Sequence, residues 1–417
     1  MMTPGDIHKL LDETIRHERG WLIASLVSRL GPSRVDLAED VAQDAIVKAL
    51  STWPYKGVPD NPRAWLRRVA GNVAIDRLRR SARELGLDET HDLATTDETI
   101  VTPSLSDPEL DLIVLCCDPS LSAQDQMILA LKTVSGFTAA ETGALLFLKP
   151  DTLAQRLARA KRHLRGRDGE VARFPTRFAL KDRMPLVLKV IYLMFAWGHL
   201  PRRGETLVRT DLCREAIRLS DALLSQKGAP ADGHHALHAL MLFQASRLPA
   251  RLGSNGELMT LETQDRDRWD RDLVQHAFWH LQIAQNDETA TRYHIEAGIA
   301  ALHAQAADWP ATDWPAIARL YETLTALAPS PAVAINHAVA CIEIGQDARA
   351  EQLLDAAAQS SEIAGHAAYY LAQARLAEAR DQTATAQDML EKARTWQTSA
   401  PVATFIDRQW QALANST

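Results

Sequence analysis

The sequence has little of what marks secreted or membrane proteins. Four of its 417 residues are cysteine, too few for a disulfide framework, and they fit a reducing compartment. No apolar run reaches membrane-spanning length, because the best candidate, residues 184–200, is short and contains Lys189. The opening residues MMTPGDIHK lack the charged and apolar regions of a secretory signal. We therefore expect a cytoplasmic protein without membrane contact.

Positive charge is also scarce in the chain as a whole. There are 46 Lys and Arg against 53 Asp and Glu, a net charge of -7, which is not typical of a nucleic-acid binder. The charges are unevenly spread, however. Residues 84–118 contain ten acidic residues and no Lys or Arg, whereas residues 149–168 contain seven basic and two acidic residues. Such segregation indicates parts with different roles.

Strand patterns are absent, and helical periodicity runs through most of the chain. From Ile7 to Arg83 the pattern is helical, with breaks at Gly31-Pro32 and across residues 53–62. The length allows two or three domains. The fold class predicted from these patterns is all-α.

The most basic predicted helix reads KPDTLAQRLARAKRHLR, residues 149–165. Leu153, Leu157, Ala160 and Leu164 recur at helical spacing and would face a core, while arginines spread over the opposite side. Taken alone, such a charge run is equally typical of a solvated helix face.

The residues before this helix favour a second interpretation. A helix over 122–133 is followed by Gly136, and Thr138 with Glu141 predicts a capping box at the start of a helix that runs to Lys149-Pro150. A short turn then leads into the basic helix, for which Asp151 or Thr152 is the expected N-cap. This order is that of a helix-turn-helix, whose second helix reads base edges in the major groove.

Two further motifs lie near the N-terminus: DLAEDVAQDAIVKAL, residues 36–50, and NPRAWLRRVAGNVAIDRLRR, residues 61–80. In the second, Trp65, Leu66 and Val69 are expected in the core, and the arginines lie elsewhere on the helix. A basic helix beside a loop with aromatic residues suits melting DNA, since bases stack on rings while the backbone is neutralised.

These two motifs closely resemble region two of extracytoplasmic-function (ECF) sigma factors, and residues 122–165 resemble their region four. The remaining sequence, including VRTDLCREAIRLSDAL and DWPAIARLYETLTALAPSPAVAINHAVA, resembles the tetratricopeptide-like extension of some of these factors. The implied domains are region two at 1–83, an acidic linker at 84–107, region four at 108–168 and a helical regulatory domain at 169–417.

The resemblance implies partners for particular residues. The partners are core RNA polymerase, through its beta-prime clamp helices and beta flap, and promoter DNA. The implied polymerase-binding residues are Asp40, Gln43 and Asp44. The residues implied to contact the minus-ten element, with the loop at 53–61, are Arg67, Arg68, Asn72, Asp76, Arg79 and Arg80. Those implied to read the minus-thirty-five element are Thr152, Gln155, Arg156, Arg159 and Arg162.

The acidic linker has two open interpretations. It is either an ordinary solvated connection or, as the resemblance implies, a strand that follows polymerase channels otherwise occupied by nucleic acid. Composition does not separate the two.

The C-terminal part is Ala-rich, and its helices come in pairs. An offset of 34 residues aligns Ala338 with Ala372, Gly345 with Ala379, Asp347 with Asp381, and Ala350 with Ala384. Small residues at these places let paired helices approach closely. We expect a tetratricopeptide-like domain that either packs on the sigma domains or receives a protein partner.

Three clusters of polar or reactive residues resemble metal-binding or other functional sites. His234, His235, His238, His276 and His280 have spacings that a metal site could use, but packed or surface histidines are the commoner outcome. Cys116 and Cys117 are expected to be buried as small hydrophobic residues. The charged run around Trp269 is either an exposed ion-pair face or a structural, interdomain or regulatory contact, made by Asp265, Arg266, Asp267, Trp269 and Asp270.

The function predicted is that of a sigma factor, regulated by its own C-terminal domain, that catalyses no reaction and needs no cofactor or metal. A one-component helix-turn-helix regulator with a ligand- or protein-binding C-terminal domain is the alternative, although it leaves the region-two motifs unexplained. A peptide-binding adaptor leaves the N-terminal arginines unexplained. No phosphate loop, nucleophile motif or carboxylate pair favours an enzyme.

Overall fold

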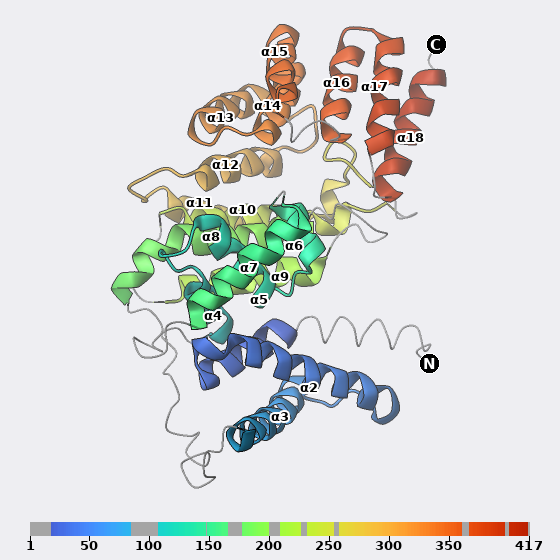
Figure 1. Cartoon of the computed structure of the whole chain (residues 1–417). Coiled ribbons are helices and arrows are strands. Elements are labelled where there is room, and N and C mark those ends of the chain that lie inside the picture. The colour runs from blue at the N-terminus through green and yellow to red at the C-terminus, as the bar shows by residue number, and fades with distance from the viewer. Residues whose placement is uncertain are drawn as a thin grey trace. The chain divides into compact units, whose positions relative to one another are not determined.

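The computed structural model describes residues 18–84, 107–146, 148–165, 177–199, 209–226, 232–253, 258–360, 367–396 and 400–415. These residues form helices and one isolated bridge, Leu252–Leu258, and contain no strand (Figure 1). The all-α fold class is confirmed. The chain divides into two compact units. Unit 1 comprises Met1–Met194 and Arg214–Pro230, and unit 2 comprises Phe195–Cys213 and Ala231–Thr417.

Unit 1 begins with a helix over residues 18–30. The elements that follow are η1 (Pro32–Arg34), α2 (Val35–Lys56), α3 (Pro62–Glu84), α4 (Pro108–Cys116), α5 (Ala123–Thr133), α6 (Ala139–Leu145) and α7 (Pro150–Arg165). It also includes most of α8 (Arg177–His199) and α9 (Thr210–Leu224). Unit 1 thus takes in parts of the chain beyond residue 168, which the sequence analysis assigned to the C-terminal domain.

Two contacts explain why α8 and α9 pack in unit 1. The Arg183 guanidinium of α8 donates hydrogen bonds to the Val114 and Cys117 carbonyls at the end of α4. The Arg218 guanidinium of α9 forms ion pairs with Asp107 and Glu109 at the start of α4. Both ends of one buried helix are therefore held by residues more than sixty positions away.

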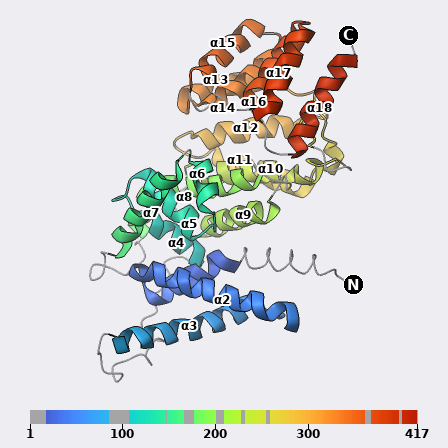
Figure 2. The same cartoon turned by 45° about the vertical axis from the view of Figure 1, so that its right-hand side comes forward.

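The helices α2 and α3 lie side by side (Figure 2). Small residues make this possible, because Ala38, Ala42, Ala45 and Ala49 are fully buried along one face of α2. The predicted break across residues 53–62 is confirmed but begins later, since α2 continues through Pro54 to Lys56 and α3 starts at Pro62. The Trp53 ring is buried and meets the Trp65 ring edge-on at 5.3 Å, and this contact holds the last turn of the helix.

The segment from α5 to α7 follows the predicted order. Ser122 caps α5, and the capping box is confirmed by hydrogen bonds of 2.7 and 3.1 Å between Thr138 and Glu141. The helix α6 ends at Leu145, earlier than predicted. The expected N-cap at Asp151 or Thr152 is also wrong: α7 begins at Pro150, and the Lys149 carbonyl accepts its first hydrogen bond from the Leu153 amide at 3.0 Å. Proline suits this first position, because its missing N–H has no partner there anyway.

Unit 2 continues with helices that contact one another in chain order. They are α10 (His234–Ser246), η2 (Leu248–Ala250), η3 (Arg266–Arg268), α11 (Arg271–Ala284), α12 (Arg292–Gln305), α13 (Trp314–Leu327), α14 (Pro331–Glu343), α15 (Asp347–Ala358), α16 (Ala367–Ala379), α17 (Thr383–Trp396) and α18 (Ala400–Asn415). None of the described helices is both long and apolar enough to span a bilayer.

Two helical hairpins in unit 2 repeat each other, but in a different register from the predicted one. The α14–α15 turn has Gly345 at φ 70°, and the α16–α17 turn has Asp381 at φ 57°, an offset of 36 residues rather than 34. Both turns close with the same pair of backbone hydrogen bonds. With this offset the buried residues Ala338, Cys341, Ala350 and Leu354 correspond to the buried residues Ala374, Ala377, Ala386 and Leu390. Ala384, which the offset of 34 matched to buried Ala350, is exposed.

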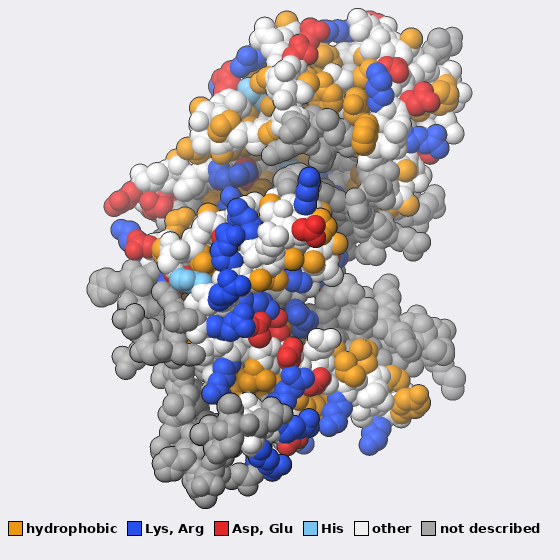
Figure 3. All heavy atoms as spheres, viewed as in Figure 1, with side chains coloured by type: hydrophobic (Ala, Val, Ile, Leu, Met, Phe, Trp, Pro, Cys, Tyr) orange, Lys and Arg blue, Asp and Glu red, His pale blue; other side chains and the backbone are white. Residues whose placement is uncertain are grey.

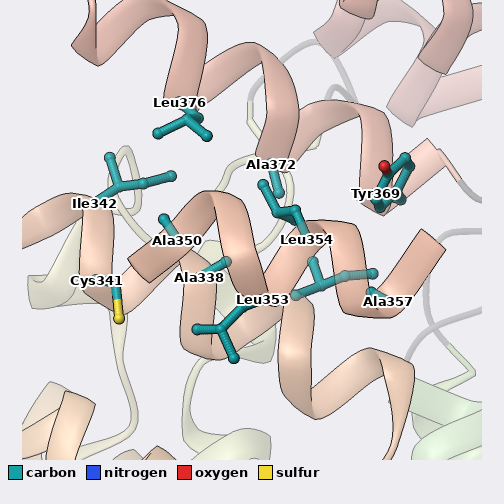
Figure 4. Packing of buried hydrophobic residues seen from close by; sticks show 11 residues of the cluster. Ala338, Cys341, Ile342, Ala350, Leu353, Leu354, Ala357, Tyr369, Ala372 and Leu376 are labelled. Atoms are coloured by element: carbon teal, nitrogen blue, oxygen red, sulfur yellow. The ribbon is translucent and has the colours of Figure 1, made fainter. Parts of the chain in front are cut away.

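The core of the first hairpin shows why small residues are needed. Ala338 of α14, Ala350 and Leu354 of α15, and Ala372 and Leu376 of α16 point toward one another (Figure 4). The alanines let the helix backbones approach, and the leucines fill the remaining space. The second hairpin therefore stacks directly on the first, as in a repeat protein.

The two turns yield a matched pair of stability predictions. Gly345→Ala is expected to destabilise unit 2 by about 1 kcal/mol, because a left-handed backbone is strained for a residue with a side chain. The new methyl group would have no neighbour within 4 Å, so no steric clash adds to this cost. Asp381→Gly should stabilise it by roughly 0.5 kcal/mol, since it removes the same strain. Urea unfolding followed by circular dichroism measures both. Shifts of the same sign would contradict the assignment.

Candidate nucleic-acid and partner interface

The arginine-rich helix α3 presents its predicted residues to solvent. Leu66, Ala70 and Ala74 are buried and face α2, and Trp65 and Val69 are half-buried. The residues assigned to the minus-ten element are all exposed: Arg67, Arg68, Asn72, Asp76, Arg79 and Arg80. Steps of three and four residues place Arg68, Asn72, Asp76 and Arg79 on one stripe opposite the core. The helix thus offers a mainly cationic face that can contact a phosphate backbone.

The aromatic residues of the adjoining loop behave differently from one another. Trp53 belongs to α2 and is buried, so it cannot stack on a base. Tyr55 is 89% exposed in the last turn of α2, beside the loop at 57–61. Of the aromatic residues predicted in this loop, Tyr55 is therefore the one whose ring is exposed and available for stacking.

The acidic residues assigned to polymerase binding also connect α2 to α3. Asp40 and Asp44 accept hydrogen bonds from the Arg77 guanidinium at 3.1 and 2.6 Å. The hydrogen bond with Asp44 raises the pKa of Arg77 above its usual value. All three side chains are at least one-third exposed, so the pairs contribute little to stability and remain accessible. Gln43 is exposed on the same helix.

Sequence reasoning missed an apolar stripe on α2. Val47 is 57% exposed and Leu50 is 44% exposed, and with Gln43 they recur at steps of four and three residues. Single exposed apolar residues are ordinary, and these two together form a small apolar patch that a protein partner can cover. The sequence did contain a signal for this stripe: alanines already fill the core face of α2, and Val47 and Leu50 lie outside that face.

The helix α7 divides into a core side and a basic side, as predicted. Leu153, Ala160 and Leu164 are buried, and Leu157 is half-buried. Thr152, Gln155, Arg159 and Arg162 are exposed. Lys and Arg side chains gather along this helix (Figure 3). Arg156 is the exception, because its guanidinium donates to buried Asp125 of α5 at 3.1 Å. It ties α7 to α5 as well as lying among the predicted reading residues.

The end of α7 contacts the N-terminal part of unit 1. The Lys161 ammonium donates to Asp36 at 3.0 Å and to Glu39 at 2.6 Å, and Arg165 pairs with Asp36 at 3.3 Å. Lys161 is only 15% exposed. Burial lowers its pKa, but the hydrogen bonds with Glu39 and Asp36 outweigh burial and the pKa is raised. These pairs hold α7 against the helix that carries the apolar stripe.

A second contact between the same parts of unit 1 leaves no space for a side chain. A Cβ atom on Gly20 would overlap the Val134 carbonyl oxygen at the end of α5. Glycine is therefore required where the helix over 18–30 approaches α5. In this structure the N-terminal helices and the α5–α7 segment pack directly on one another.

The cysteine and histidine clusters lie elsewhere in the chain. The four cysteines are free and buried, as predicted for Cys116 and Cys117. His235 and His280 share a hydrogen bond of 2.9 Å, and burial and the nearby His280 lower the pKa of His238 to about 3. Across the described residues no group of histidine, cysteine and carboxylate side chains has the arrangement of a metal site.

The run around Trp269 scaffolds unit 2. Asp265 and Asp270 cap η3 and α11 by accepting backbone hydrogen bonds, and the Arg266 guanidinium donates to the His303 and Ala306 carbonyls. Trp269 is buried, whereas the Asp267 side chain is almost fully exposed. Four of the five residues therefore hold the local structure. The acidic linker lies outside the described residues apart from Glu84, which ends α3, and Asp107, which caps α4.

Comparison with known proteins places these surfaces in a family. Residues 15–84 match sigma-70 region 2, and residues 183–285 match a family of unknown function, DUF6596. An uncharacterized protein of Rhizobium meliloti (strain 1021) is 36% identical over 340 residues, which cover 78% of this chain and 80% of that protein. No solved structure matches the chain. The match to sigma-70 region 2 supports a role as a sigma factor in transcription initiation. With this identity and coverage, the chain belongs to the same family as the Rhizobium meliloti protein.

Proposed function

We propose that the protein is an ECF-type sigma factor that binds core RNA polymerase in the cytoplasm and directs it to a promoter, without catalysing a reaction or binding a cofactor. The observation that carries the proposal is the α2–α3 pair. Within the segment similar to sigma-70 region 2, one helix exposes an apolar stripe and the next exposes a row of arginines. A protein contact and a DNA contact are thus available on adjacent helices.

The segment α5–α7 serves as region four in this proposal. Its capping box, short turn and basic second helix follow the plan of a helix-turn-helix. Thr152, Gln155, Arg159 and Arg162 are exposed together and are available to a major groove. Arg156 contributes less to DNA binding in this scheme, because Asp125 already neutralises its charge.

The C-terminal part is proposed to act as a tetratricopeptide-like regulatory domain that receives a protein partner or limits access to polymerase. Support comes from the repeated hairpins of α14–α17 and from the fusion of this part to a sigma-like segment. The residues of DUF6596 fall on α8 to α11, before these hairpins.

Run-off transcription with purified core polymerase tests the proposal. The full chain is expected to bind core enzyme and to produce defined transcripts from cognate promoter fragments. A chain ending at Pro230 lacks the proposed regulatory domain, so the amount of transcript should change. Its start site should not change, because Arg183 and Arg218 still hold α4 in place. A truncation after residue 168 would lose both contacts to α4 and is less informative. Failure of both chains to bind core polymerase would overturn the proposed function.

A further inference from the structure

Unit 2 contains three neighbouring arginines, two of which lie against one buried tryptophan ring. Arg251 is 6% exposed and Arg266 is 8% exposed, while Arg247 is half-buried. The guanidinium carbons of Arg247 and Arg266 lie 5.6 and 5.2 Å from the centre of the Trp269 ring, which is itself buried. Three positively charged groups, two of them buried, are thus gathered in one part of unit 2.

Within the described parts of the chain, the hydrogen-bond partners of these arginines are formally neutral. Arg247 donates to the side-chain oxygens of Gln264 and Gln244 at 3.2 and 3.0 Å. Nη1 of Arg251 lies 2.5 Å from Nε2 of His199 and donates a hydrogen bond to it when Nε2 is unprotonated. Arg266 donates to the His303 and Ala306 carbonyls. Among the described residues no carboxylate forms an ion pair with any of the three. Asp308 favours the charge of Arg266 but does not contact it.

Several donors of the cluster have no partner. Nε of Arg251 and Nη2 of Arg266 are buried in the described structure without a hydrogen bond, and so is Nδ1 of His199. Burial and the neighbouring arginines lower the pKa of Arg247 to about 9, and burial lowers the pKa of Arg251 to about 10. Both groups still carry their charge at neutral pH. Burying such charges and unpaired donors costs folding free energy unless an opposite charge with hydrogen-bond acceptors pairs with them.

We propose that Arg247, Arg251 and Arg266 form a binding site for the carboxylate or phosphate group of a small anionic ligand. The planar guanidinium presents paired N–H donors that match the oxygens of these two groups. Arg247, the most exposed of the three, is where the ligand enters. His199 lies beside Arg251, and when its Nδ1 carries the proton it adds a further donor.

The site gives unit 2 a sensory role that the sigma-like segment does not supply. Gln264 and Trp269 come from the segment just before α11, and Arg247 and Arg251 follow α10. Ligand bound among them would fix the connection between these two helices. Its occupancy can be tested without polymerase or DNA, so the proposal stands or fails independently of the proposed function.

Thermal unfolding of the full-length protein in sodium phosphate, sodium acetate and sodium chloride of equal ionic strength tests the site. Phosphate or acetate at ten or more times its dissociation constant is expected to raise the Tm by about 2 °C or more above the value in chloride. Arg247→Gln should abolish the difference between the salts. Arg251→Met should also abolish it, and because a buried charge is removed the variant should be no less stable than the parent in chloride.

Arg271→Gln is the matched control. Arg271 is a nearby arginine that is 58% exposed, and its one ion pair among the described residues is with Asp267. Its response to phosphate and acetate should equal that of the parent. A larger response to phosphate assigns a phosphoryl ligand, and a larger response to acetate assigns a carboxylate. Equal Tm values in all three salts, or an undiminished response in Arg247→Gln, would overturn the proposal.

Discussion

Leu50→Asp on α2 is expected to lower the affinity of the full chain for core RNA polymerase by about 30-fold. The side chain is 44% exposed and lies beside Val47, so the two form the apolar centre of the candidate polymerase contact. Truncation of a central interface residue costs about 2 kcal/mol, which corresponds to about a 30-fold loss of affinity. The aspartate carboxylate would lose its hydration in the interface, so this substitution should cost at least as much as a truncation. Fluorescence anisotropy of labelled protein titrated with core enzyme measures the effect.

Leu327→Asp provides the control for this experiment. Leu327 is 50% exposed at the end of α13, in unit 2, and is therefore similar to Leu50 in type and exposure. It should leave the affinity for polymerase unchanged. Circular dichroism should show both variants folded, because neither side chain belongs to a core. Equal affinities for parent and Leu50→Asp would remove the apolar stripe from the proposed contact.

Arg159→Glu is expected to weaken promoter binding by about 10- to 100-fold and to reduce the slope of log affinity against log salt by about 2. The residue is exposed on α7, and within the described chain it forms no ion pair. Reversal of its charge removes one favourable phosphate contact and adds a repulsive one. Gel-shift titrations of the polymerase complex at several salt concentrations measure both quantities.

The choice of Arg159 rather than Arg156 follows from the structure. Reversing the charge of Arg156 would also break its pair with Asp125, so packing and DNA binding would be lost together. Arg349→Glu supplies the control, since it makes the same change of net charge at an exposed position of α15. If Arg349→Glu weakened promoter binding as much as Arg159→Glu, general electrostatics and not α7 would account for the effect.

Local features of the fold were predictable from the sequence. The capping box at Thr138 and Glu141 depends on residues three positions apart, and the amphipathic pattern of α7 depends on neighbours along one helix. The end of α2 was not predictable in the same way. Pro54 indicated a break, but the contact between Trp53 and Trp65 keeps the helix intact to Lys56.

The features that sequence patterns missed depend on residues far apart in the chain. The hairpin repeat was aligned two residues out of register, because alanines are so frequent there that several offsets match. The pair between Arg156 and Asp125 and the site around Trp269 join different elements, and no periodicity connects them. The exposed stripe on α2 was visible only once the alanines had been placed in the core.

The ion pairs of α7 have a consequence for how the chain behaves in the presence of bulk nucleic acid. Arg156, Lys161 and Arg165 are already neutralised by carboxylates of the same chain. Contact between an arginine or lysine and a phosphate releases cations condensed on the DNA, but a side chain already paired with a carboxylate must give up that pair first. These three residues therefore add less to counterion release when α7 meets a duplex. Together with a net charge of -7, this predicts that the free protein binds random genomic DNA weakly.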